Sequence, residues 1–280
     1  MIELRQALTT AQQQLKPLFD TWRLDCELLL CHTLNKTRSY LYSHPEVTLS
    51  SEQLKVFNDL VNLRQQGHPI AYLTKKREFW SLNLTVSEDT LIPRPETELL
   101  VELILDKIKK TQATVLDLGT GTGAIALALA SERPHWQITA CDKSTKALNI
   151  AKHNAKENAI TNVNFLQSDW FSAVDTDKFD IIVSNPPYIA ADDPHLKQGD
   201  VIFEPKSALV SGEQGFFDIN QIISHAFNHL NPNGYLFLEH GYQQQLAILN
   251  TLRQSCYHHC KGHSDLAGQP RVVSAQKTTS

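Results

Sequence analysis

The feature that most constrains the fold is the run from Val115 to Gly123, Val-Leu-Asp-Leu-Gly-Thr-Gly-Thr-Gly. Its first four residues are mostly apolar, its three glycines alternate with threonines, and the apolar stretch Ala124–Ala130 follows. This order is typical of a buried strand that ends in a tight loop and continues as a buried helix. Glycines in such a loop let the backbone turn sharply and approach a ligand closely. We therefore expect an α/β sheet with a ligand site where this strand ends.

Strands and helices are expected to keep alternating after Gln112. The apolar runs predict strands at residues 114–118, 137–141, 163–167, 179–184 and 235–239, then at 257–261 and 271–275. Helical spacing predicts helices at 124–132, 146–158, 216–230 and 243–253. This order is typical of a doubly wound, Rossmann-like α/β sheet, with the last two strands added antiparallel at one edge.

The first 75 residues predict a small bundle of helices. Apolar residues recur at helical spacing from Ile2 to Leu18, and residues 24–34 are almost continuously apolar, as in a buried helix. A third long helix is expected to begin at Ser50 or Ser51 and to end at Gly67. This part of the chain contains none of the residues to which we assign chemistry, so we expect it to select a partner.

A change of period separates this bundle from the sheet. Apolar residues alternate along residues 78–92, which predicts a hairpin or an extended linker. The segment Pro93-Arg-Pro-Glu-Thr-Glu98 then stiffens the chain and opens a helix. We therefore predict a helical substrate-recognition domain at 1–75, a β-hairpin linker at 76–94 and a large α/β domain at 95–280.

Composition narrows the class of protein. The start of the chain has no apolar signal-peptide region, and no apolar run approaches the roughly 18 residues of a membrane span. Five cysteines in 280 residues are typical of free thiols in a reducing compartment. We therefore expect a cytoplasmic protein that does not enter a membrane. We also expect no direct binding of nucleic acid, since the net charge is −4 and residues 95–280 hold 15 basic against 20 acidic residues.

The residues around the glycine loop indicate the ligand. Asp142 follows Gly123 by nineteen positions and ends the second expected strand, where a carboxylate accepts hydrogen bonds from ribose hydroxyls. A nicotinamide enzyme shows a similar layout, but its glycines are spaced Gly-x-Gly-x-x-Gly. The spacing here is Gly-x-Gly-x-Gly, which makes less provision for a pyrophosphate and favours S-adenosylmethionine. Asp117 just before the loop also suits the loop amides or the cationic amino-acid end of S-adenosylmethionine. Asp169 and Trp170 follow the third strand, where they offer an acceptor and a flat face to adenine.

The segment Asn185-Pro186-Pro187-Tyr188 ends the fourth expected strand, at the edge where open α/β sheets bind ligands. Its two prolines have no N–H donor, so the turn is stiff and presents acceptors. The Asn185 side-chain oxygen and the Pro186 carbonyl are placed to accept both hydrogens of an NH2 group. That grip helps a planar amide nitrogen to pyramidalise as positive charge develops on it. Tyr188 is expected to wall the pocket or stack on the target group.

Two further segments have a less definite role. Residues 189–215 form a long connection, which we expect to shape the substrate entrance. Cys256, Cys260 and His263 invite a zinc interpretation, but Cys-x3-Cys is not a strong ligand spacing, and we predict no metal.

Taken together, the motifs of the large domain resemble those of a class I methyltransferase that acts on amino groups. The resemblance narrows to the PrmC/HemK family along nearly the whole chain, through the segments Gly67-His-Pro-Ile-Ala-Tyr-Leu73, Pro93–Glu98, Phe203-Glu-Pro205, Leu238-Glu-His-Gly241 and Asp265-Leu-Ala-Gly-Gln-Pro-Arg271.

This resemblance implies N5-methylation of the glutamine in the Gly-Gly-Gln motif of class I peptide-chain release factors, with S-adenosyl-L-homocysteine as product. It also implies cofactor contacts at Gly119, Thr120, Gly121, Thr122, Gly123, Asp142, Trp170 and Asn185. Substrate binding is implied at Asn185, Pro186, Pro187 and Tyr188, with catalysis by Asn185, Pro186 and Tyr188.

Two alternatives remain open from the residues alone. Asn-Pro-Pro-Tyr also suits an exocyclic amine of a nucleic acid or the glutamine of a ribosomal protein, although the acidic large domain offers little of the basic groove that nucleic acid needs. A non-catalytic, cofactor-sensing module is the other alternative. It predicts a damaged turn at 185–188, and that turn is intact.

Overall fold

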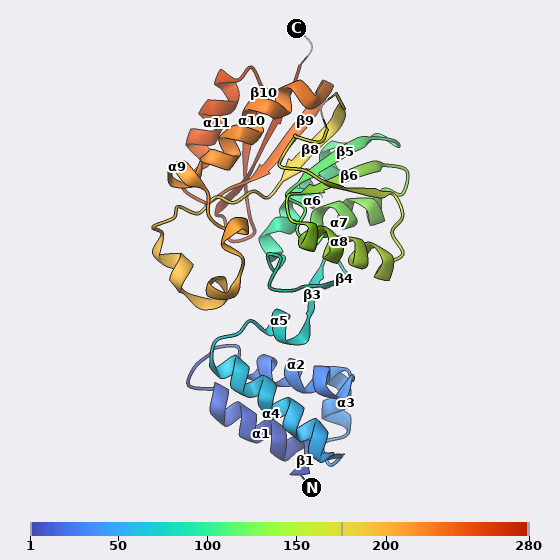
Figure 1. The fold of residues 1–280 in the computed structure, drawn as a ribbon, viewed down its shortest axis with the longest axis vertical. Helices are drawn as coiled ribbons and strands as arrows, with labels where there is room; N and C mark the ends of the chain where they lie inside the picture. Colours follow the sequence, from blue (N-terminus) through green and yellow to red (C-terminus); the bar gives the residue numbers. More distant parts are fainter. Residues whose placement is uncertain (1, 175, 279–280) are drawn as a thin grey trace. The chain divides into compact units, whose positions relative to one another are not determined.

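The computed structural model describes residues 2–174 and 176–278, which form two compact units. The first unit contains the residues up to Lys76 together with Lys197–Phe203. The second contains Arg77–Leu196 and the chain from Glu204 onwards. Helices build the first unit, and a sheet flanked by helices builds the second (Figure 1). None of the described helices has the length and hydropathy that a membrane span requires.

Helices packed around an aliphatic core form the first unit. They are α1 (Leu4–Leu15), α2 (Trp22–Leu34), α3 (Arg38–Ser43), α4 (Ser51–Gln65) and α5 (Ile70–Thr74), with the short strands β1 (Ile2–Glu3) and β2 (Thr48–Leu49). Leu15, Leu29 and Phe57 of α1, α2 and α4 are fully buried against one another. The unit is therefore a helical bundle with a core of its own.

The expected start of the third helix is confirmed by its cap. Ser50 Oγ accepts a hydrogen bond from Gln53 N, and the Gln53 side chain accepts one from Ser50 N. The helix expected from Ile2 begins two residues later. Ile2 and Glu3 instead pair with β2, in a ladder that local helical spacing does not reveal. The six-residue helix α3 was not expected either.

The segment Lys197–Phe203 belongs to the helical unit, around Arg64. Arg64 is buried, and its Nη1 lies 3.5 Å from Asp200 Oδ1. The ring of Phe203 packs on that of His68, with 4.3 Å between the centroids. Part of the long connection at 189–215 is thus a component of the helical unit, which no sequence pattern indicated.

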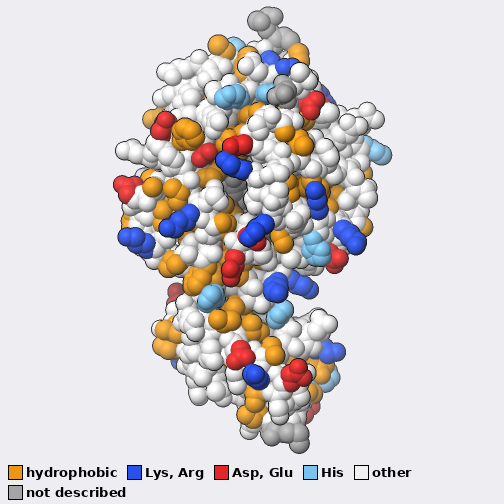
Figure 2. Space-filling view, viewed as in Figure 1, with side chains coloured by type: hydrophobic (Ala, Val, Ile, Leu, Met, Phe, Trp, Pro, Cys, Tyr) orange, Lys and Arg blue, Asp and Glu red, His pale blue; other side chains and the backbone are white. Residues whose placement is uncertain are grey.

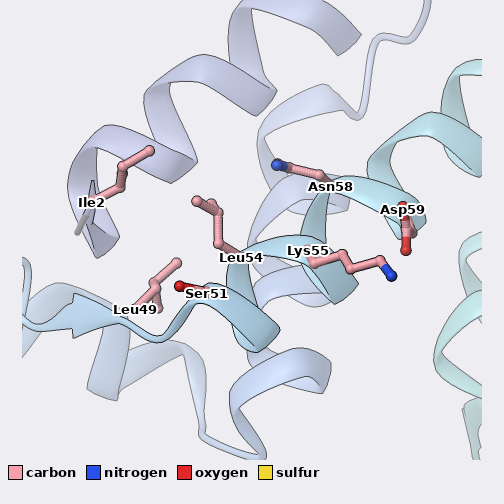
Figure 3. Close-up of a pocket in the computed structure, with 7 residues that line it drawn as sticks. All are labelled: Ile2, Leu49, Ser51, Leu54, Lys55, Asn58 and Asp59. Atoms are coloured by element: carbon pink, nitrogen blue, oxygen red, sulfur yellow. The ribbon is translucent and has the colours of Figure 1, made fainter.

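A hollow of about 480 Å³ opens on the helical unit, lined by Ile2, Leu49, Ser51, Leu54, Lys55, Asn58 and Asp59 (Figure 3). Apolar side chains from β1, β2 and α4 gather at one end of it, as Figure 3 shows. Its two charged side chains, Lys55 and Asp59, are exposed. The two charged side chains that line the hollow are therefore in contact with solvent and not buried.

The second unit is organised around a seven-stranded sheet in the order β10-β11-β9-β8-β5-β6-β7. Its strands are β5 (Thr114–Leu118), β6 (Gln137–Asp142), β7 (Val163–Gln167), β8 (Phe179–Ser184), β9 (Leu230–Glu239), β10 (His258–Ser264) and β11 (Pro270–Gln276). The strands from β9 to β7 are parallel, and β11 runs antiparallel to both β9 and β10. The expected doubly wound sheet with an antiparallel edge is confirmed. The main difference is that β9 begins five residues earlier than expected.

Helices cover both faces of this sheet (Figure 1). They are α6 (Glu98–Lys107), α7 (Ala124–Glu132), α8 (Thr145–Glu157), α9 (Gly212–Gly215), α10 (Phe217–His229) and α11 (Gln245–Gln254). The 3-10 turns η1 (Pro95–Thr97) and η4 (Lys206–Ala208) also lie in this unit, whereas η2 (Pro194–Lys197) ends at the first residue of the segment that belongs to the helical unit and η3 (Gly199–Phe203) lies within that segment. Val115 packs with the cluster of α6 and α7, and its neighbour Leu116 packs with that of α10 and α11. Two separate cores therefore hold β5 in the middle of the sheet.

The expected hairpin is formed by β3 (Lys76–Phe79) and β4 (Leu82–Thr85). Its turn residues, Trp80 and Ser81, both have positive φ, 51° and 62°. Such turns usually contain glycine or asparagine. Here the Trp80 backbone N–H donates to Glu98 and its indole Nε1 donates to Glu132, both at 2.9 Å. These bonds anchor the hairpin turn to α6 and α7.

Candidate active site

Two of the motifs singled out in the sequence meet where the sheet reverses its strand order. β5 and β8 are adjacent and parallel, so the glycine loop and the Asn-Pro-Pro-Tyr turn leave the same edge of the sheet. A cavity of about 430 Å³ lies there, lined by Asp89, Thr90, Leu91, Gly119, Gly121, Asp142, Lys143, Ser144, Ala147, Ser168, Asp169, Trp170, Asn185, Pro187, Pro205, Ser207, Ala208, Val210 and Asp218. This is the position at which open α/β sheets bind ligands.

Asp142 holds the glycine loop in place. Its Oδ2 accepts a hydrogen bond from Gly121 N at 2.9 Å, and its Oδ1 accepts one from Ser144 N at 2.8 Å. Burial raises the pKa of this carboxyl, and the two backbone N–H donors act against that rise. Gly121 has a φ of 55°, and a Cβ at that position would contact nothing within 4 Å. The loop backbone is thus open to the cavity beside an acceptor group.

Three of the residues expected to contact the cofactor, Thr120, Thr122 and Gly123, are not among those that line this cavity. Thr120 is buried and donates its hydroxyl to Asp117 at 2.6 Å, and the Thr122 carbonyl accepts from Asn154 at 2.9 Å. At Gly123, with φ of 84°, a Cβ would lie 3.1 Å from Leu127 and 3.2 Å from an α8 side chain. These residues shape the loop and the helix packing behind it.

Asp117 is fully buried, and burial raises its pKa to about 7. The sequence suggested that it acts on the loop amides or on the amino-acid end of a ligand. In the structure its carboxylate accepts the Thr120 hydroxyl, and Asp117 is not among the residues that line the cavity. Asp117 therefore contacts the loop through the Thr120 hydroxyl and the following helix through the Ala126 backbone N–H.

Trp170 borders the cavity over the glycine loop. Its φ is 50°, and a Cβ on Gly119 would lie at ordinary contact distance, 3.5 Å, from its Cζ3 atom, so the indole lies next to the loop. Glycine is favoured at 119 by its φ of 72°. Asp169 also lines the cavity, and its Oδ2 lies 2.7 Å from Lys143 Nζ in an exposed ion pair. An aromatic side chain and a carboxylate, Trp170 and Asp169, thus both line the cavity, and their contact with an adenine stays a prediction.

On the opposite side of the cavity, Asn185 begins a chain of hydrogen bonds. Its Nδ2 donates to Thr97 Oγ1 at 3.1 Å, and Thr97 Oγ1 donates to Glu239 Oε2 at 2.7 Å. Tyr188 donates its hydroxyl to Glu239 Oε1 at 3.2 Å. Pro187 lines the cavity, whereas Pro186 is buried and does not. One network of hydrogen bonds therefore joins three segments that are far apart in the sequence, those of Thr97, of Asn185–Tyr188 and of Glu239.

Glu239 is the charged centre of this chain. It is 1% exposed, and burial raises its pKa to about 7, against the opposing effects of the Thr97 and Tyr188 hydroxyls and of Arg271. Burial also raises the pKa of Tyr188, which therefore keeps its proton as a donor. The arrangement supports the turn without providing a strong base.

The loop after the turn is tied to the segment that opens α6. Arg94 Nη2 lies 2.8 and 2.7 Å from the two carboxylate oxygens of Glu204, whose side chain is fully buried. The next residue, Pro205, lines the cavity, as do Ser207, Ala208 and Val210 of the same loop. The second half of the segment 189–215 therefore lines the cavity, and its role at a substrate entrance stays a prediction.

Some lining residues had escaped the sequence analysis. Asp89, Thr90 and Leu91 follow the hairpin, and Asp218 lies in the first turn of α10. No motif marks them, and only their position beside the cavity identifies them. Ser144 could have been found from the sequence, because serine is a favoured N-cap residue just before a helix. Its hydroxyl caps α8 by accepting a hydrogen bond from Ala147 N at 3.2 Å.

The cysteine and histidine side chains near the edge strand β10 are not gathered into one cluster in the described part of the chain. No group of three or more His, Cys, Asp or Glu side chains within residues 2–174 and 176–278 is placed to hold a metal ion. His263 is instead 2.8 Å from Ser274 of the neighbouring strand, and Cys256 is exposed.

Comparison with known families and structures agrees with this geometry. Residues 6–74 match the PrmC N-terminal domain, and residues 95–217 match the methyltransferase small domain. A crystal structure of a methyltransferase from Pyrococcus furiosus has the same fold, with a TM-score of 0.54 and 19% identity over 71% of this chain and 90% of that one.

Curated relatives are similar over almost their whole length. The release factor glutamine methyltransferase of Shewanella oneidensis is 50% identical over 96% of this chain and 94% of its own. That of Escherichia coli is 47% identical over 96% of both chains. A chain with this fold, this turn beside a glycine loop and this degree of identity belongs to the release factor glutamine methyltransferase family.

Proposed function

We propose that this protein transfers the methyl group of S-adenosylmethionine to the side-chain amide nitrogen of the glutamine in the Gly-Gly-Gln motif of class I release factors. The observation that carries this proposal is the position of Asn185, whose amide lines the same cavity as Gly119 and Gly121. Family membership supports the same reaction, because the relatives are named for it.

The residues of the cavity fit S-adenosylmethionine. When bound, it supplies an electrophilic methyl group on a sulfonium. Asp142 offers acceptor oxygens beside an open backbone, which suits the two ribose hydroxyls. Trp170 offers a flat face and Asp169 a carboxylate to an adenine. The cavity volume, about 430 Å³, lies in the usual range for a small-ligand site.

The acceptor side of the cavity suits a planar NH2 group. Asn185 Nδ2 is engaged by Thr97, so its Oδ1 remains as an acceptor for a substrate N–H. We propose that the carbonyl of Pro186, a buried residue between the lining residues Asn185 and Pro187, accepts the second hydrogen. Both bonds strengthen as positive charge develops on the nitrogen, which lowers the barrier to transfer. Placement does most of the work, because the leaving thioether is neutral.

We propose a protein substrate and a recognition role for the helical unit. A cavity of this size contacts one side chain and its neighbours, so selecting one glutamine needs a second surface. The distribution of charged side chains on the surface also favours a protein substrate over a nucleic-acid substrate. On the face shown in Figure 2, Lys and Arg side chains are interspersed with acidic ones and form no continuous basic stripe.

A methyl-transfer assay tests the proposal. The enzyme and tritiated S-adenosylmethionine are incubated with a release factor, with the same factor carrying Gln→Ala in Gly-Gly-Gln, and with DNA. We expect label on the first substrate only. Label on the altered factor would place the site elsewhere, and label on DNA would favour the nucleic-acid alternative.

A protein-to-peptide comparison tests the helical unit. A chain beginning at Glu78 should still bind S-adenosylmethionine, and its ratio of kcat/KM for release factor over a Gly-Gly-Gln peptide should fall by roughly a hundredfold, for a docking surface worth ~3 kcal/mol. Because Lys197–Phe203 packs with the deleted unit, cofactor binding is the necessary check on folding. An unchanged ratio in a folded protein would leave the helices with a packing role only.

A further inference from the structure

We infer that Glu239 and Thr97 form a relay that sets the orientation of the Asn185 amide, presenting its oxygen to the substrate when Glu239 is ionised and its NH2 group when Glu239 is protonated. Neither residue is assigned to the reaction by the turn motif, and neither lines the cavity. The inference deepens the proposed function and rests on it. It makes Glu239 and Thr97 positioning residues.

The direction of each hydrogen bond follows from the chemistry of the groups. An ionised carboxylate only accepts, so the single hydroxyl hydrogen of Thr97 is committed to Glu239 at 2.7 Å. The Thr97 oxygen then accepts from Asn185 at 3.1 Å, which requires the NH2 end of the amide on that side. No hydrogen bond to Asn185 Oδ1 is formed within the described part of the chain. The acceptor needed for a substrate amide is therefore kept available.

Protonation of Glu239 reverses this direction. A carboxylic acid that donates to Thr97 frees the threonine hydrogen, which then points at Asn185 and favours its oxygen on that side. The amide would then turn its NH2 group toward the cavity. Two NH2 groups would face each other, so the grip on the substrate nitrogen would be lost.

The surroundings of Glu239 bring this proton within the working range of pH. Its pKa is raised to about 7 by burial. The groups that face it are the hydroxyls of Thr97 and Tyr188 and the guanidinium of Arg271, which favour the carboxylate, and Glu96, which disfavours it. Since ionisation sets the productive orientation, kcat should rise with pH through this region.

The first test compares two substitutions at Thr97. Thr97→Val keeps the shape of the side chain and removes the hydroxyl. It should lower kcat on the release factor by roughly thirtyfold, with the KM for S-adenosylmethionine within about threefold. Thr97→Ser restores the hydroxyl and should restore most of kcat. If the Val variant keeps full kcat, or if Ser fails as badly as Val, the relay is wrong.

The second test follows the pH profile and the amide itself. Glu239→Gln cannot ionise, so the rise of kcat near pH 7 should disappear. In ¹⁵N NMR of the wild-type enzyme, the Asn185 side-chain NH2 signal should titrate near the same pH and should stop titrating in Thr97→Val. The relay would be overturned if the Asn185 NH2 signal did not change with pH. It would also be overturned if kcat of Glu239→Gln still fell as the pH is lowered through 7. The NMR result needs no substrate, whereas an inactive wild type on the release factor would overturn the proposed function alone.

Discussion

The two sides of the cavity are built in different ways. On the cofactor side, Asp142 holds the glycine loop through Gly121 and the next helix through Ser144, so its contacts join neighbouring strand ends. On the transfer side, Asn185 depends on Thr97 and Thr97 depends on Glu239, residues that lie 88 and 142 positions apart in the sequence. The first side is a compact βαβ unit, and the second is assembled from three distant segments.

This difference suggests what each side contributes. We expect a local unit bonded mainly through its backbone to tolerate changes elsewhere and to bind the proposed cofactor about equally in the ground and transition states. An assembly of distant side chains can be tuned by groups that never touch the substrate. We therefore expect substitutions on the cofactor side to change affinity and those on the transfer side to change turnover. The predictions below test this division.

The largest effect is expected at Asn185. Asn185→Ala removes the acceptor for the reacting nitrogen and should lower turnover by roughly a thousandfold or more, as removal of a transition-state hydrogen bond does. The affinity for S-adenosylmethionine, measured by calorimetry, should change by less than about tenfold, since one hydrogen bond is worth ~0.5–1.5 kcal/mol. Near-normal turnover in this variant would contradict the division.

The next effect is expected at Asp142. Asp142→Ala removes the partner of Gly121 N and the proposed acceptor for the ribose hydroxyls, and hydrogen bonds to a charged group are worth ~1.5–3 kcal/mol. The KM for S-adenosylmethionine should rise by roughly thirtyfold or more, with a smaller effect on kcat at saturation. Asp142→Asn keeps one acceptor oxygen, so its KM for S-adenosylmethionine should lie between those of the wild type and of Asp142→Ala. Unchanged cofactor affinity in the Ala variant would remove Asp142 from the site.

Two glycines of the same loop should respond differently. Gly121→Ala meets no neighbour within 4 Å but adds a methyl group at the cavity wall, so it should weaken cofactor binding and destabilise the fold by only ~1 kcal/mol. Gly123→Ala must displace Leu127 and Ala151, and it should cost ~1–3 kcal/mol of folding free energy. Denaturant unfolding and calorimetry of both variants separate the two roles. Equal loss of cofactor affinity in the two would mean that Gly123 also faces the ligand.

The smallest effect is expected at Ser144. Ser144→Ala removes the cap of α8, worth ~1 kcal/mol, and keeps the backbone N–H that Asp142 accepts. The free energy of unfolding should fall by about that amount while the affinity for S-adenosylmethionine stays within about twofold. A large loss of affinity would show that the hydroxyl itself contacts the ligand and that the backbone alone does not hold this side.

Much of the fold was predictable from the sequence because its signals are local. The strands at 114–118, 163–167 and 179–184 and the helix at 124–132 have the predicted bounds. Short β-branched runs, glycines and caps act within a few residues, so they specify each element and the edge of the sheet to which it leads. The same reasoning predicted that the glycine loop and the Asn-Pro-Pro-Tyr turn would lie at one edge.

The glycine loop shows where this reasoning stops. The sequence treated Gly119 to Gly123 as equivalent ligand contacts, and the structure places Gly119 and Gly121 on the cavity while Gly123 packs against α8. Spacing reveals that glycine is needed, but only the positions of neighbouring atoms reveal whether it makes room for a ligand or for a helix.

Only the tertiary structure decided which residues support the reacting turn. Thr97 and Glu239 were visible in the sequence as parts of two motifs, with no indication that both meet Asn185. The helical unit likewise includes Lys197–Phe203, a segment far from it in the chain. Hydrogen bonds between distant segments depend on how strands and loops pack, and local propensity carries no information about them. The sequence by itself determined most elements of the sheet and the positions of the glycine loop and the Asn-Pro-Pro-Tyr turn, whereas the tertiary structure decided how that turn is held.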